Sequence, residues 1–277
     1  MGAVLCATSV GITARVFKDL GKLHTKEAQI ILGAAVIDDV LGLIILAIVA
    51  GIIGAAQAGQ TLALGEIVRL VVLALVFIGG TLALGHFLMP KLVAQIAKLR
   101  TSGMMLLVAL VLAFGLSYLA NAIGLAAIIG AFAAGLILEE AHFKNFREKY
   151  QLADLLKPLA AVLVPIFFVL MGVQVRLETF ANLSVLGVAA GITLAAILGK
   201  QVCGFGALQK GLDRLTIGVG MIPRGEVGLI FAGIGKSLNV IDDATFSAVV
   251  IMVIVTTLVT PPILKLTLAR REKAATV

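Results

Sequence analysis

Two adjacent carboxylates, Asp38 and Asp39, stand near the middle of an apolar run that covers residues 30–45. A charged residue at the centre of a membrane helix costs roughly 2.5–3.5 kcal/mol on insertion scales, and ionisable residues at such positions usually serve a function. Adjacent helical residues are about 100° apart around the axis, so the two side chains point in different directions. The pair therefore predicts a functional site in which the two carboxylates have different surroundings.

The chemistry open to such carboxylates is exchange of a proton for a hard cation, because hard cations prefer oxygen ligands. Small residues one turn away, Ala34, Ala35 and Gly42, leave room for another backbone to approach. The alternative is that one aspartate only pairs with a buried base and holds the helices together. This alternative is stronger for Asp38 than for Asp39.

Lys200 is the base that an aspartate of residues 30–45 could meet. It follows the apolar stretch 184–199, and the chain stays mostly apolar after it, through Leu208. A lysine near a helix end can extend its ammonium group to the membrane surface. Because Lys200 stands well short of the loop, we favour an internal ion pair over this extended arrangement.

A second group of polar residues interrupts the apolar run 214–235, where Pro223 is followed by Arg224 and Glu226. Proline removes a backbone donor and nearby glycines weaken a helix, so this run predicts a discontinuous helix of the kind that attracts ions near the midplane. Thr8 and Ser9 make residues 2–17 a candidate for a second broken helix, although such residues ordinarily serve packing. Arg224 and Glu226 fit neutralisation of helix ends, or of each other, better than binding of a transported ion.

The composition requires these residues to be placed by membrane helices. The chain has 277 residues, 61% hydrophobic and 13% charged, with a mean hydropathy of +1.14, whereas soluble domains have about 25% charged residues. Apolar runs this long are too long for barrel strands, so we predict an all-α polytopic membrane protein. We expect nine segments, at approximately 2–17, 28–53, 63–88, 103–121, 123–138, 159–175, 184–208, 214–235 and 244–267.

Basic residues gather in alternate loops between these segments, as the positive-inside rule requires. The C-terminus is therefore expected in the cytoplasm, and the net charge of +7 reflects topology rather than nucleic-acid binding. Residues 139–157 form a charged linker that we expect to lie along the cytoplasmic surface as a solvated connecting helix, with contact to anionic lipid as the alternative.

Three motifs resemble the monovalent cation:proton antiporter-2 family: residues 7–15 (ATSVGITAR), 33–43 (GAAVIDDVLGL) and 223–229 (PRGEVGL). The similarity extends to residues 165–169 and to the Gly-Lys pair at 199–200. It implies an NhaA-like antiporter fold in which two discontinuous helices cross beside the ion site.

The resemblance also implies roles for individual residues. Asp39 corresponds to the ion-binding carboxylate, and Asp38 corresponds to the partner that forms a salt bridge with Lys200. Thr8 and Ser9 match the unwound stretch of one crossing helix, and Ile222 to Glu226 match that of the other. Family members with two carboxylates and this lysine are typically electrogenic sodium/proton exchangers.

The implied domain organisation has three parts: a first core half with a linking helix at residues 1–88, dimerisation helices at 89–183, and a second core half at 184–277. Such antiporters usually begin with a few more spans than precede Asp38 here. The first inverted repeat is therefore expected to be incomplete.

The function expected from these residues is secondary antiport, in which a monovalent cation, Na⁺ first and K⁺ or Li⁺ after it, is exchanged for protons by alternating access. We expect a homodimer in lipid, in a bacterial inner membrane, without a cofactor, a resident metal or nucleic acid. Ligand-regulated K⁺ efflux and a non-transporting fragment are the alternatives. An enzyme is not expected, because no set of nucleophile and base is present.

Overall fold

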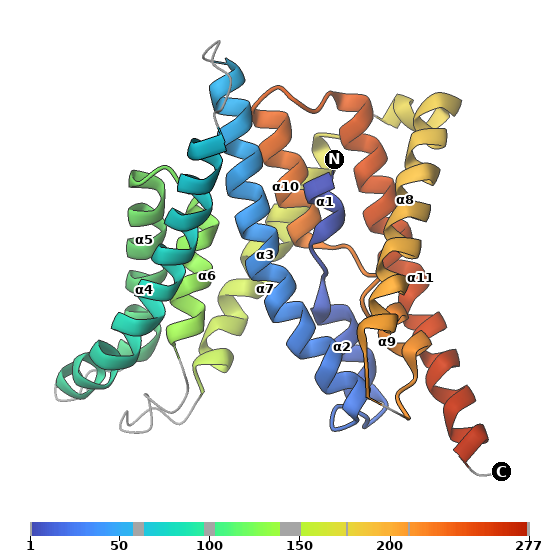
Figure 1. Cartoon of the computed structure of the whole chain (residues 1–277), viewed down its shortest axis with the longest axis horizontal. Coiled ribbons are helices and arrows are strands. Elements are labelled where there is room, and N and C mark those ends of the chain that lie inside the picture. The colour runs from blue at the N-terminus through green and yellow to red at the C-terminus, as the bar shows by residue number, and fades with distance from the viewer. Residues whose placement is uncertain are drawn as a thin grey trace. The chain divides into compact units, whose positions relative to one another are not determined.

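The computed structural model describes residues 2–57, 64–96, 103–138, 151–175, 177–209 and 211–275. In these ranges every regular element is a helix (Figure 1), as the predicted all-α class requires. Six of the helices are long and apolar enough to cross a membrane. They are α3 (Lys26–Gln57), α4 (Leu64–Ile96), α5 (Met104–Ala122), α7 (Leu152–Val173), α8 (Leu183–Cys203) and α11 (Asp243–Ala275).

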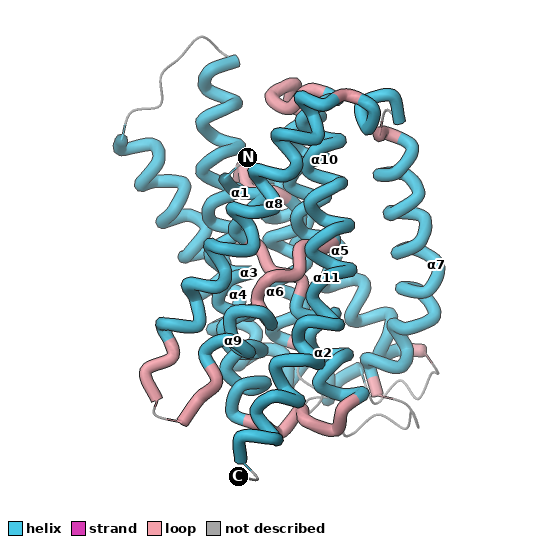
Figure 2. Tube along the Cα trace, turned by 90° about the vertical axis from the view of Figure 1, so that its right-hand side faces the viewer, coloured by secondary structure: helices cyan, strands magenta, loops and turns pink. Residues whose placement is uncertain are grey.

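Two further apolar segments are each divided into two short helices. The first consists of α1 (Gly2–Cys6) and α2 (Val10–Asp19), and the second of α9 (Arg214–Gly220) and α10 (Glu226–Ser237). Figure 2 shows short loop segments within the bundle as well as at its ends. Each divided segment leads into a long helix, α3 in the first case and α11 in the second.

Several helix ends differ from the sequence prediction for identifiable reasons. Helix α4 continues past 88 to Ile96 with Pro90 inside it, because a proline removes one backbone hydrogen bond and can kink a helix without ending it. Helix α6 (Ala127–Ile137) begins later than 123, because Gly124 adopts a φ of +87° in the turn that follows α5.

The charged linker expected at 139–157 is shorter than predicted at its C-terminal end. Residues 152–157 form the beginning of α7, with Pro158 and Pro165 farther along the same helix. The stretch 139–150 lies outside the described residues, so the interfacial location of the linker stays a prediction.

One compact unit comprises residues 1–42 and 168–277. Helices α8, α9, α10 and α11 pack together in it, and α1 packs on α10 while α2 packs on α11. Its apolar core includes Phe17, Ile31, Ile217 and Leu264. Two 3₁₀ turns, at Leu177–Ala181 and Gly204–Gly206, flank α8. All residues that the sequence predicts for the site belong to this unit.

The second compact unit comprises residues 43–167. Helices α5 and α6 pack closely in it, and α4 packs on α6. A Cβ atom added to Gly130 would lie only 2.1 Å from the carbonyl oxygen of Leu116, so glycine is required where α6 meets α5. This contact confirms the prediction that small residues in this segment allow close helix packing. The division into two units differs from the three predicted parts, whose functional boundaries stay a prediction.

Candidate ion site at the crossing of two broken helices

The two breaks meet and are joined by backbone hydrogen bonds. The amide of Ser9 donates to the carbonyl oxygen of Pro223 at 2.9 Å. The hydroxyl of Thr13 donates to the Gly220 carbonyl at 2.7 Å. Because a broken helix leaves backbone groups without intrahelical partners, each break supplies the partners that the other lacks.

Close approach of the two breaks depends on Gly225. A Cβ atom at this position would lie 2.6 Å from Ser9 Oγ and 2.7 Å from Ser9 Cβ. Real Cβ atoms do not approach other heavy atoms so closely, so any larger residue must push the two segments apart. Glycine at 225 is therefore a requirement of the crossing.

Arg224 is buried inside the crossing, with 1% of its surface exposed. Its Nη1 donates to the carbonyl oxygen of Ala7 at 2.8 Å and to Thr8 Oγ1 at 3.3 Å. Ala7 follows the last residue of α1, so the guanidinium lies at the C-terminal end of that half-helix. A cation at a helix C-terminus is electrostatically favourable.

Glu226 occupies the first position of α10 and accepts a hydrogen bond from Ser9 Oγ at 2.9 Å. Ser9 is the N-cap residue of α2, so the carboxylate lies near the N-terminal ends of two half-helices. An anion is favourable there. Arg224 and Glu226 therefore have opposite charges at helix ends of opposite polarity, and no ion pair joins them within the described part of the chain.

The remaining two predicted residues of the second break are placed differently. Pro223 contributes its carbonyl to the crossing, as described above. Ile222 is 4% exposed and packs in the apolar core of its unit. Ile222 therefore anchors the second break to the apolar core by packing.

Sequence reasoning missed two threonines of α11 that hold the second break in place. Thr256 Oγ1 accepts a hydrogen bond from the amide of Arg224 at 3.3 Å, and Thr257 Oγ1 donates to its carbonyl oxygen at 2.8 Å. Both polar backbone groups of Arg224 are thus satisfied by adjacent hydroxyls. The signal available in the sequence was a pair of threonines at a similar distance from the start of α11 as the aspartates from the start of α3. Asp39 and Thr256 are each the fourteenth residue of their helix.

The structure brings Lys200 and Asp38 together. The ammonium nitrogen lies 3.0 Å and 3.1 Å from the two carboxylate oxygens. Their side chains are only 10% and 18% exposed. Lys200 thus pairs with Asp38 instead of extending to a membrane surface.

Asp39 forms no such pair in the part of the chain that the structure describes. Its Oδ1 is buried and has no hydrogen-bond partner within the described residues. Asp38, Glu226 and Lys200 lie close enough to act on it electrostatically. A buried carboxylate oxygen without a donor is a ready acceptor for a proton or a ligand for a cation. The described residues contain no cluster of three or more acidic, histidine or cysteine side chains that could hold a metal ion.

Comparison with known proteins identifies the family of the chain. Residues 1–270 match the family model described as sodium/hydrogen exchanger, transmembrane. The chain belongs to this family. Members of the sodium/hydrogen exchanger family are transporters, and this membership together with the six long apolar helices makes the chain part of an integral membrane protein.

Three curated relatives show the extent of the similarity. The chain is 43% identical to the high-affinity Na⁺/H⁺ antiporter NhaS3 of Synechocystis, over 99% of its own length and 59% of that protein. It is 37% identical to the Na⁺/H⁺-K⁺ antiporter GerN of Bacillus cereus, over 99% of its length and 68% of GerN. It is 35% identical to a Na⁺/H⁺ antiporter of Enterococcus hirae, over 95% of its length and 67% of that protein. The chain thus spans about three-fifths to two-thirds of these sodium/hydrogen exchangers.

Proposed function

We propose that this protein exchanges a monovalent cation, Na⁺ first, for protons across a membrane. The proposal rests on one observation: Lys200 neutralises Asp38, while the adjacent Asp39 has a buried oxygen with no hydrogen-bond partner in the described ranges. The named activities of NhaS3, GerN and the Enterococcus protein support it.

In the proposed cycle, Asp39 is the carboxylate for which the cation and the proton compete. A hard cation needs oxygen ligands, and Asp39 offers one beside the non-helical stretches of the two breaks. Asp38 becomes a second oxygen donor when its bond to Lys200 opens. The cation then replaces both the proton on Asp39 and the ammonium group on Asp38.

Lys200 is the proposed coupling group. When the cation leaves, the lysine pairs with Asp38 again and its charge compensates that of the carboxylate. Release of the lysine from Asp38 lets it give up a proton, because an ammonium group deprived of its counter-charge in a low-dielectric setting is costly.

The crossing supplies the frame for this exchange. Thr8 and Ser9 of the first break, with Pro223 of the second, line the proposed route, and Ile222 supports it from the core. Arg224 and Glu226 compensate the half-helix ends, so that two short helices can end inside an apolar unit.

We further propose an NhaA-like fold with nine membrane segments, two of them the broken helices. The recurrence of a broken helix followed by a long one supports an inverted-repeat origin, incomplete in its first half. Under this proposal residues 1–88 and 184–277 are core halves, residues 89–183 form a dimerisation region in contact with lipid, and the C-terminus is cytoplasmic in a bacterial inner membrane. Cross-linking of the full protein in its membrane tests the dimer.

Proteoliposomes with an internal pH dye test the proposed activity in the full protein. Asp39→Asn removes the carboxylate charge at nearly constant volume and should abolish Na⁺-driven pH change. Asp19→Asn is a matched control, since Asp19 is exposed and pairs with Arg15 one turn away. Full retention of exchange by Asp39→Asn would overturn the assignment. Absence of exchange in the unmodified full protein would favour the non-transporting alternative.

K⁺ is the second candidate cation, because the name of GerN includes it. The same vesicles distinguish the two ions when the Na⁺ gradient is replaced by a K⁺ gradient. Exchange driven only by K⁺ would move the protein toward the potassium-efflux alternative.

A further inference from the structure

Helix α11 contains two adjacent prolines, Pro261 and Pro262, just past its midpoint. Proline has no amide hydrogen, so the carbonyl oxygens of Thr257 and Leu258 receive no hydrogen bond from the residue four positions later. Sharp bends in helices are almost always found at such positions. The helix is therefore weaker against bending here than along the rest of its length.

The proline pair lies close to the level of the crossing. Thr256 and Thr257 bond to the amide and the carbonyl oxygen of Arg224 in the second break. Pro261 follows Thr257 by four residues, which is about one helical turn. The backbone hydrogen bond between the two breaks places the first break at the same level. Three elements of one unit are thus interrupted together: α1–α2, α9–α10 and α11.

The two segments of α11 on either side of the prolines pack against different neighbours. In the first segment, residues 243–260, Ala248 packs with Ala189 of α8. In the second segment, residues 263–275, Leu264 belongs to an apolar core that also contains residues of α2, α3 and α9. Each segment is therefore held by its own set of helices, and the prolines separate the two sets.

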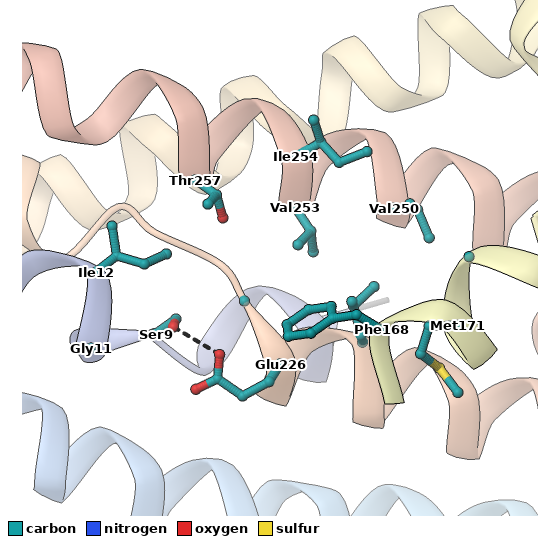
Figure 3. Close-up of a pocket in the computed structure, with 13 residues that line it drawn as sticks. Ser9, Gly11, Ile12, Phe168, Met171, Glu226, Val250, Val253, Ile254 and Thr257 are labelled. Atoms are coloured by element: carbon teal, nitrogen blue, oxygen red, sulfur yellow. Dashed lines mark hydrogen bonds between the residues drawn. The ribbon is translucent and has the colours of Figure 1, made fainter. Parts of the chain in front are cut away.

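A cavity of about 580 Å³ borders the first segment but not the second. It lies beside the crossing between α2, the end of α7, α10 and α11 (Figure 3). Figure 3 shows Val253 and Thr257 on the α11 side and Phe168 and Glu226 on the other. Among the described residues, no side chain of α11 beyond Thr257 reaches it. Protein interiors contain few such voids and resist movement, so this cavity gives the first segment room to tilt.

Two unbroken helices oppose bending at this level. Helices α3 and α8 are continuous where they carry Asp38 and Lys200, and the ion pair of these residues ties one helix to the other. Glu226 lies close enough to act electrostatically on Asp39, so this tie lies near the crossing. In the proposed antiport cycle the ion pair opens, and its opening removes the tie.

We propose that Pro261 and Pro262 form a hinge in α11. The first segment tilts toward the cavity and carries the second break with it through its two threonines, while the second segment stays with α2 and α9. That the tilt follows opening of the ion pair and is needed for exchange rests on the proposed antiport. The bending itself does not.

Alanine and glycine at both proline positions separate bending from a fixed shape. Pro261→Ala with Pro262→Ala restores both amide hydrogens and favours a straight, stiff helix, whereas the corresponding glycine pair restores the hydrogens in a chain that still bends easily. In proteoliposomes of the full protein, the alanine pair should lower the maximal exchange rate about tenfold with little change in the KM for Na⁺, because a conformational step is slowed. The glycine pair should retain most of the rate.

Melting temperatures and a proline control show whether the loss has another cause. The alanine pair should raise the melting temperature in detergent, so that its slower exchange does not come from unfolding. Pro158→Ala is the matched control, since Pro158 also lies inside a membrane helix, α7, but in the other unit. It should leave the exchange rate unchanged. If the alanine pair does not reconstitute, Pro262→Ala alone should show the same effects at smaller size.

A fluorescence measurement follows the tilt without exchange. The sequence contains no tryptophan, so Phe168→Trp places a single indole across the cavity from α11. The full protein with this change is reconstituted in lipid nanodiscs, without an ion gradient, and titrated at alkaline pH with NaCl and with choline chloride. We expect a saturable emission shift with NaCl only. The alanine pair should suppress the shift, and the glycine pair should keep it.

Equal exchange rates for the alanine and glycine pairs, whether both retained or both lost, would overturn the hinge. A full emission shift in the alanine pair, or no shift with NaCl in the Phe168→Trp protein, would also overturn it. A shift that alanine suppresses and glycine keeps, in a protein that shows no exchange, would support the hinge and contradict the proposed antiport. The two failures are therefore distinguishable.

Discussion

Lys200 and Asp38 are separated by 162 residues in the chain, yet the lysine Nζ lies 3.0 Å from one carboxylate oxygen and 3.1 Å from the other. Among the residues that the structure describes, the neighbouring Asp39 has no comparable bond, and its buried Oδ1 has no hydrogen-bond partner. Of two carboxylates that are adjacent in sequence, the charge of Asp38 is thus neutralised by an ion pair and that of Asp39 is not. The difference arises because α8 approaches α3 from the side that Asp38 faces.

Breaking this ion pair from either side should destabilise the protein. Asp38→Asn and Lys200→Gln should each lower the free energy of unfolding by about 3–5 kcal/mol, because each leaves a buried charge alone. The double variant should lose less than the sum of the two single losses. Thermal melting of the purified full protein in detergent measures these differences.

The exposed pair Arg15–Asp19 provides the control for this cycle. Its side chains are 78% and 56% exposed, so removing Asp19 should cost at most about 1 kcal/mol. Additive effects of Asp38→Asn and Lys200→Gln would mean that the pair does not contribute to stability.

Lys200 should also determine the charge moved in each exchange cycle. Lys200→Gln removes the proposed coupling proton, so residual exchange should be electroneutral or much slower. Currents on a solid-supported membrane measure the charge. Lys236→Gln is the control, since Lys236 also pairs with an aspartate, Asp243, at 2.9 Å. Unchanged currents from Lys200→Gln would show that this lysine does not carry one of the exchanged protons.

Acidic pH should weaken cation binding. In the proposed exchange Asp39 loses its proton to bind a cation, so the apparent KM for Na⁺ should rise as pH falls, by about tenfold per pH unit once the protonated form dominates. The maximal rate at saturating Na⁺ should change less than the KM. Initial rates of exchange at several pH values measure both, and a KM independent of pH would contradict competition at one site.

The close approach at Gly225 predicts a steric effect. Gly225→Ala should strongly reduce exchange, because its Cβ would collide with Ser9. Gly228→Ala, three residues later in α10, is the control, since the nearest atom to a Cβ there is 3.7 Å away, at Val253. Adding Ser9→Gly to the Gly225→Ala variant should restore part of the activity. Equal effects of the two alanine substitutions would contradict the steric explanation.

Thr257 should matter through its hydroxyl alone. Thr257→Val leaves the carbonyl oxygen of Arg224 without this donor, at a cost of about 1–3 kcal/mol, and should lower both melting temperature and exchange. Thr257→Ser keeps the hydroxyl and should retain most of both. Thr193→Val is the control in α8, where the hydroxyl donates to the carbonyl oxygen of Ala189 in its own helix. A Thr257→Val variant that behaves like Thr257→Ser would show that the bond has no importance.

The membrane class, the long helices and the presence of a site could all be predicted from the sequence. Hydropathy alone determines where a chain can lie in lipid, and two aspartates at 38 and 39 are too costly there to be incidental. Pro223 and the glycines around it likewise predicted a break, because their effect on a helix is local. Helix ends near Pro90 and Gly124 were wrong, since whether a proline or glycine ends a helix depends on packing.

The partners of these residues were decided only by the tertiary structure. Helical geometry requires the two aspartates to face different ways, but the approach of α8 decides that Lys200 pairs with Asp38. The bond of Ser9 to Glu226 joins residues 217 positions apart, and the cavity beside it collects side chains from four helices. The hydrogen bonds of Thr256 and Thr257 to the backbone of Arg224 also depend on the tertiary structure. Threonines are ordinary residues in a helix, and only the adjacent backbone of the second break gives these two a partner. The sequence determines where a buried charge, a helix break or a hydroxyl needs a partner. Only three-dimensional packing determines which group becomes that partner.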